Sequence, residues 1–157
     1  MHTNEELVEV LNDLIEINND RIKGYEKASD EAQETDIDLK AIFATLAKNS
    51  LRFARELTEQ VIKLGGESAT GTTNRGKIYR VWMDVKKAFA TNDRLAILAS
   101  CEFGEDAAQK AYEEALATDA DLNVAIRQLI TGQKSTLKSD HELIKKYRDA
   151  HKVVSSL

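Results

Sequence analysis

The chain has 157 residues, a formal net charge of −5 and 42% apolar residues, which suits one soluble domain with a full core over 1–157. The acidic balance disfavours a nucleic-acid partner or an anionic membrane surface, and no stretch approaches the roughly 20 apolar residues of a membrane span. Proline is absent and there are only 7 glycines, which favours long helices over turn-rich sheets.

The first half of the chain predicts two amphipathic helices. The first covers about 4–32, where apolar side chains recur at steps of three and four. The second begins after Thr35 or Asp36 and ends at Gly65-Gly66, a pair that terminates helices. Their predicted inward stripes are Leu7, Leu11, Leu14, Asn18, Ile22, Tyr25, Ala28 and Ala32, then Leu39, Ile42, Leu46, Asn49, Phe53, Leu57, Gln60 and Leu64.

A Gly/Ser/Thr-rich segment follows and then a short helix over about 74–90, whose Trp82 is expected to pack against the bundle. Two further long helices are predicted over about 93–117 and 122–153. Their predicted stripes are Leu95, Leu98, Glu102, Glu105, Gln109, Tyr112 and Leu116, then Leu122, Ile126, Leu129, Gln133, Leu137, Asp140, Ile144 and Tyr147.

The lengths of the connections predict how these helices pack. The first two long helices and the last two are joined by short turns, so each pair forms an antiparallel hairpin. The connection between the hairpins is long enough to cross the bundle, which makes the second and third long helices parallel. We therefore predict an all-α, ferritin-like four-helix bundle with one long crossover that carries an extra short helix.

Four motifs carry a resemblance to a known family: GY at Gly24, LGG before Glu67, R-x-W ending at Trp82, and E-x-G-E-D beginning at Glu102. With them the chain resembles a bacterial ferritin-like four-helix-bundle family of unassigned function, along nearly its whole length. Gly104-Glu105 followed by Tyr112 also looks like the glutamate helix of rubrerythrin-type di-iron proteins. The resemblance implies a fold and leaves the activity open.

A polar layer is predicted halfway along the bundle. Counting from the turns places Asn18, Asn49, Arg52, Glu102, Glu105, Gln133 and Thr136 at similar heights. A di-iron site would need a glutamate from each of two helices and Glu-x-x-His from the other two. This layer offers asparagine, glutamine and an arginine in most of those places, and a guanidinium cannot bind a metal cation.

Three interpretations of Glu102 and Glu105 are open: a metal site, a solvated face, and a buried polar network. We favour the network, in which Arg52 donates to Glu102 or Glu105 and the remaining polar atoms are satisfied by Asn18, Asn49 and Gln133. No cofactor is then needed. In the alternative, Glu102 and Glu105 bind iron or manganese.

The favoured function is a non-catalytic bundle that acts as a binding, assembly or stress-related module with a degenerate metal site. The alternatives are a di-iron or manganese carboxylate protein, and a redox protein that uses Cys101. Cys101 is expected to be a buried, inert thiol, although a cluster of Cys101, His141 and Asp140 would be a metal or redox site. The single cysteine and the lack of a signal peptide indicate the cytoplasm. Homo-oligomers are suggested by apolar residues outside the stripes, namely Val8, Ile15, Phe43 and Phe89.

Overall fold

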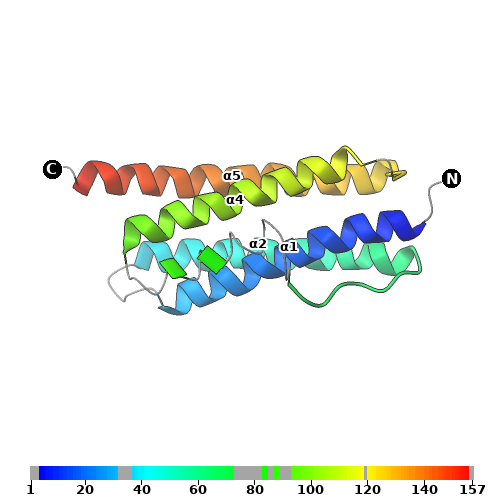
Figure 1. The fold of residues 1–157 in the computed structure, drawn as a ribbon, viewed down its shortest axis with the longest axis horizontal. Helices are drawn as coiled ribbons and strands as arrows, with labels where there is room; N and C mark the ends of the chain where they lie inside the picture. The colour runs from blue at the N-terminus through cyan, green and yellow to red at the C-terminus, as the bar shows by residue number, and fades with distance from the viewer. Residues whose placement is uncertain are drawn as a thin grey trace.

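The computed structural model describes residues 4–31, 37–72, 83–84, 87–88, 93–118 and 120–155. Within them lie four long helices: α1 (Asn4–Glu31), α2 (Ile37–Lys63), α4 (Arg94–Leu116) and α5 (Val124–Ser155). They form an all-α bundle, as predicted, and the described part of the chain contains no strand (Figure 1). None of its helices is both long enough and apolar enough to cross a membrane.

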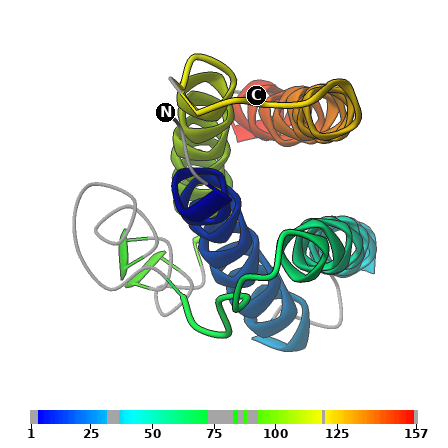
Figure 2. The same cartoon turned by 90° about the vertical axis from the view of Figure 1, so that its right-hand side faces the viewer.

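The helices pack in the predicted order. α1 contacts α2 and α4, while α5 contacts α4 and α2, so the four helices form a closed square (Figure 2). α1 and α2 run in opposite directions, as do α4 and α5 (Figure 1). Consequently α2 and α4 are parallel, and the connection between them returns along the length of the bundle. The predicted topology with one long crossover is confirmed.

Local signals set the helix ends. Asp93 caps α4, since its side chain accepts hydrogen bonds from the backbone N–H groups of Leu95 and Ala96. Asn123 caps α5 by accepting from the N–H of Ile126 at 2.8 Å. These caps satisfy backbone donors that the first turn of a helix leaves without partners.

The end of α2 is fixed by the glycine pair identified in the sequence. Gly65 has a φ of 79°, a left-handed conformation that glycine adopts at little cost. Gly66 N–H donates to the Val61 carbonyl at 3.0 Å and Gly65 N–H to that of Ile62 at 2.9 Å, which is a Schellman motif. A Cβ on Gly66 would lie 2.7 Å from a methyl group of Val8, so the absence of a side chain lets the chain pass close to α1.

The crossover then follows α1. The Asn12 amide donates to the Glu67 carbonyl at 2.9 Å and accepts from the Ala69 N–H at 2.8 Å. Seven residues further on, Asn19 donates to the Gly71 carbonyl at 2.9 Å. Of the predicted short helix over about 74–90, residues 83–84 and 87–88 are helical. The prediction for Trp82 lies outside the described residues.

The apolar core is divided into two clusters by a polar centre. One cluster gathers around Leu11, Leu57 and Tyr112, and the other around Tyr25, Phe43 and Leu98. The prediction that Ile15 and Phe43 face outward is wrong, because each is 1% exposed. Val8 is half-buried against the core, and Phe89 lies outside the described residues.

Candidate functional site

Arg21 lies at the centre of the bundle and is 0% exposed. Its guanidinium donates to one residue from each of the other three helices: Ser50 on α2, Glu105 on α4 and Asp140 on α5. Burial alone lowers the pKa of Arg21, but the facing negative charges outweigh burial and raise it. Arg21 is therefore a permanent internal cation that joins all four helices.

Glu105 is the principal partner of Arg21. Its Oε1 atom accepts from Arg21 Nε at 3.1 Å, from Arg21 Nη2 at 2.7 Å and from the Tyr25 hydroxyl at 2.5 Å. Its Oε2 atom is buried without a hydrogen-bond partner among the described residues. Hydrogen bonds to a charged oxygen are the strong ones, and three on one atom favour the ionised carboxylate.

Asp140 is the second carboxylate at the centre, and it is held more weakly. Arg21 Nη2 donates to its Oδ2 at 3.2 Å, while Asn49 Nδ2 lies 3.3 and 3.4 Å from its two oxygens. Burial raises the pKa of Asp140, Arg21 opposes that rise, and the charge of Glu105 adds to it. The net effect is a raised pKa.

A second group of hydrogen-bonded side chains, centred on Tyr112, lies further along the bundle axis than the group around Arg21. Asn18 donates to the Tyr112 hydroxyl at 2.8 Å, and that hydroxyl donates to Gln133 Oε1 at 2.6 Å. Gln133 in turn donates to the Phe53 carbonyl at 3.3 Å and to Glu56 Oε1 at 3.2 Å. This chain of hydrogen bonds ties α1, α4, α5 and α2 together through the uncharged side chains of Asn18, Tyr112 and Gln133. Glu56, the charged residue at its end, is half-buried.

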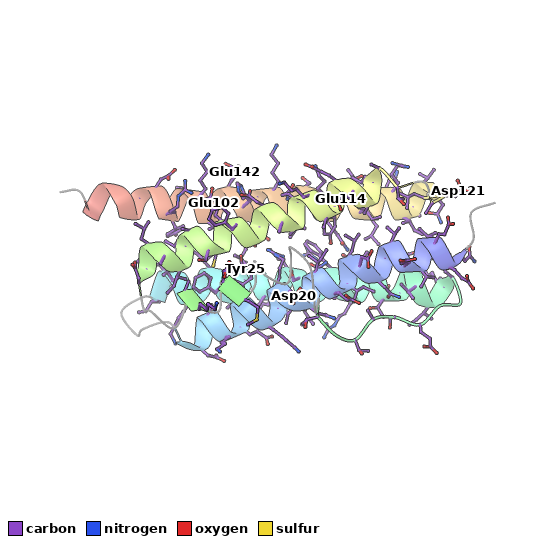
Figure 3. All side chains as sticks on the ribbon, viewed as in Figure 1. Asp20, Tyr25, Glu102, Glu114, Asp121 and Glu142 are labelled. Carbon is purple, nitrogen blue, oxygen red and sulfur yellow. The ribbon has the colours of Figure 1, made fainter. Side chains whose placement is uncertain are left out.

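Glu102 lies apart from both groups. It is half-buried and pairs with Arg148 of α5, and His141 of α5 approaches it at 3.8 Å. Nε2 of His141 lies closer to Asp106, at 2.7 Å. In Figure 3 the labels of Glu102 and Tyr25 lie on opposite sides of α4, toward α5 and toward α1 respectively. Glu102 therefore joins α4 to α5 through Arg148, whereas Glu105 joins α4 to α1 through Arg21 and Tyr25.

Three predicted placements need correction. Arg52 is exposed, with its guanidinium 5.1 Å from the centroid of the Phe53 ring, and Arg21 occupies the role predicted for it. Gln133 belongs to the Tyr112 group, whereas Asp140 lies level with Glu105. Asn18 is likewise bonded to Tyr112 rather than to Glu105.

Sequence reasoning missed Arg21 and Ser50, although a signal for Arg21 was present. Steps of four and three from Leu7 run through 11, 14, 18, 21, 25 and 28, and this series includes Arg21. The predicted stripe took the apolar neighbour Ile22 instead, and Ile22 is half-buried. Strict spacing was the better guide than hydrophobicity at this position.

Cys101 is fully buried, and burial followed by the charge of Glu105 raises the pKa of its thiol well above its ordinary value. His141 faces Asp106 and Glu102 rather than this thiol. We expect Cys101 to react with a thiol reagent only as fast as the protein unfolds, since the thiolate is the reactive form. Labelling followed with and without denaturant checks this, and rapid labelling of the native protein would contradict it.

A family model described as a domain of unknown function (DUF2383) matches residues 6–118. The chain belongs to the DUF2383 family. The DUF2383 match covers α2, α4 and all of α1 after its first two residues, so it includes Arg21 and Glu105, while Asp140 on α5 lies beyond it. No curated protein matches the chain.

Proposed function

We propose that this DUF2383 protein is a non-catalytic helical bundle of ferritin-like ancestry that acts as a binding, assembly or stress-related module. Its centre holds a guanidinium where a ferritin-like di-metal protein holds metal ions. The observation that supports this is the position of Arg21, buried in the middle of the bundle with acceptors from the other three helices.

The residues around Arg21 are a poor set of metal ligands. A di-iron centre in a bundle uses four carboxylates and two histidines. Around Arg21 there are two carboxylates, Glu105 and Asp140, together with the hydroxyl of Ser50. Within the described residues, no group of three or more His, Cys, Asp or Glu side chains is arranged to hold a metal ion.

The alternative of an iron or manganese centre built on Glu102 and Glu105 has less support. The two carboxylates do not converge, since Glu105 binds Arg21 and Glu102 pairs with Arg148. A pair of metal-ligating carboxylates must point at one position, and each of these has its own cation.

The proposal is tested by metal analysis of protein purified without chelators. We expect the wild-type protein to contain no stoichiometric iron or manganese, because Arg21 already balances the buried carboxylates. Near-stoichiometric iron or manganese in the wild-type protein would overturn the proposal.

An Arg21→Glu variant provides a second test, because it replaces the internal cation with a third buried carboxylate. Added Mn²⁺ should then raise the melting temperature of the variant with increasing concentration, because a ligand that binds only the folded state stabilises it. The matched control is Arg52→Glu, which makes the same exchange at an exposed position. If the melting temperature of Arg21→Glu did not change with Mn²⁺ concentration, the placement of Arg21 at a former metal position would be contradicted.

A further inference from the structure

Among the described residues, the buried centre holds more negative than positive formal charge. Arg21 contributes one positive charge, while Glu105 and Asp140 contribute two carboxyl groups, and all three residues are 6% exposed or less. An unpaired charge in a protein interior is costly, and a buried group commonly changes its protonation state to avoid that cost. The centre therefore needs one further positive charge, or one carboxyl group must be neutral.

The hydrogen bonds distinguish the two carboxyl groups. Glu105 Oε1 accepts three hydrogen bonds of 3.1 Å or less, two of them from the cation. Asp140 accepts only contacts of 3.2 to 3.4 Å. Strong donors stabilise the ionised form, so the negative charge belongs on Glu105.

We propose that Asp140 carries a proton in the folded protein at neutral pH, so that the buried centre is neutral overall. The inference rests on the proposed function, in which Arg21 is the one cation that the described residues place at the centre. Arg21 donates to Oδ2, so the proton is bound to Oδ1. The amide of Asn49 lies beside that atom, at 3.3 Å from its nitrogen, and by turning about its Cβ–Cγ bond it presents its carbonyl oxygen as the acceptor.

The other groups at the centre do not compete for this proton. Arg21 is permanently charged, and Ser50 and Asn49 do not titrate. Burial raises the pKa of Tyr25 and of the Cys101 thiol, so both stay neutral. Among the described groups that the four helices direct at the cluster, Asp140 on α5 is the one whose titration changes the charge of the centre as pH rises.

The stability of the fold should consequently depend on pH with a definite sign. The pKa of Asp140 is raised in the folded state above its ordinary value of 3.8. Above that value the folded protein holds a proton that the unfolded chain has lost, so stability falls as pH rises and levels off once pH exceeds the folded pKa.

The test compares wild-type protein with Asp140→Asn in urea unfolding between about pH 5 and about pH 9, a range chosen around the ordinary pKa of carboxyl groups. The unfolding equilibrium constant of the wild type should rise by up to about tenfold per pH unit until the folded pKa is passed. Asp140→Asn, which imitates the neutral acid, should lack the part of this pH dependence that comes from Asp140. At the upper end of the pH range, the variant should be at least as stable as the wild type. Asp30→Asn, at an exposed position on α1, is the matched control and should keep the wild-type slope.

The proposal is overturned if Asp140→Asn keeps the full slope of the wild type. A second measurement does not depend on any variant folding: the ¹³Cγ chemical shift of Asp140 in the wild-type protein. That shift should have the value of a protonated carboxyl group at neutral pH, and the value of an ionised carboxylate would overturn the proposal. Metal analysis of the same sample distinguishes a failure of this proposal from a failure of the proposed function. Bound iron or manganese contradicts the proposed function whether or not Asp140 is protonated.

Discussion

Arg21→Met should lower the free energy of unfolding by about 3–5 kcal/mol, the usual cost of removing one partner of a buried ion pair. Methionine fills much of the same space, so the loss comes from the charge rather than from a cavity. Glu105 loses its two hydrogen bonds from the cation, and Asp140 loses its contact to α1. For a chain of this size the melting temperature should fall by roughly 10 °C.

The control is Arg52→Met, the same substitution at the arginine that the sequence pattern favoured. Because Arg52 is exposed, the melting temperature of the Arg52→Met variant should stay close to that of the wild type. Thermal unfolding followed by circular dichroism measures both variants. Equal losses at the two positions would show that Arg21 does not form the buried centre.

Phe43→Ala should be nearly as damaging, with a loss of about 3–5 kcal/mol, because it empties a buried aromatic position. Phe43 is 1% exposed and stacks on Tyr25, with ring centroids 5.8 Å apart. Tyr25 donates to Glu105, so the substitution also removes support from the polar centre. Urea unfolding gives the loss directly.

Phe103 provides the matched control, since it is 66% exposed on α4. Phe103→Ala should leave stability nearly unchanged, because its ring is already largely in water. If instead Phe43→Ala were harmless and altered only the oligomeric state, Phe43 would belong to an outer face, as the sequence pattern suggested. A sedimentation measurement on each variant separates these outcomes.

The topology could be predicted because local signals fix it. Gly65-Gly66 ends α2 through backbone geometry that glycine favours, and Asp93 begins α4 as an N-cap. The length of the connection between them then determines which helices run parallel. None of these inferences depends on which way a helix is rotated about its own axis.

The polar centre could not be predicted in full because it depends on rotation. One residue along a helix corresponds to about 100° around its axis. Choosing Ile22 instead of Arg21 therefore placed the wrong side chain inside, and the buried Ser50 was missed beside the half-buried Asn49, which does contact Asp140. Apolar preference favoured Ile22, whereas three acceptors on other helices make burial of Arg21 tolerable.

The position of α5 along the bundle was a separate error. Counting equally from the turn paired Glu105 with Gln133, but Asp140 lies level with Glu105, two helical turns further along. α4 ends at Leu116 and α5 begins at Val124, and the described residues between them are not helical. Residues in such a connection do not advance along the bundle axis at the helical rise of about 1.5 Å, so a count of residues does not give a height.

Arg21 and Glu105 form one buried unit at the centre of the bundle. A double-mutant cycle with Arg21→Met, Glu105→Gln and the combined variant, followed by urea unfolding, measures how strongly the two side chains depend on each other. We predict a coupling free energy of about 2–3 kcal/mol, with the combined variant more stable than the sum of the single losses requires. Single losses that simply add, within about 0.5 kcal/mol, would show that Arg21 and Glu105 act independently and do not form such a unit.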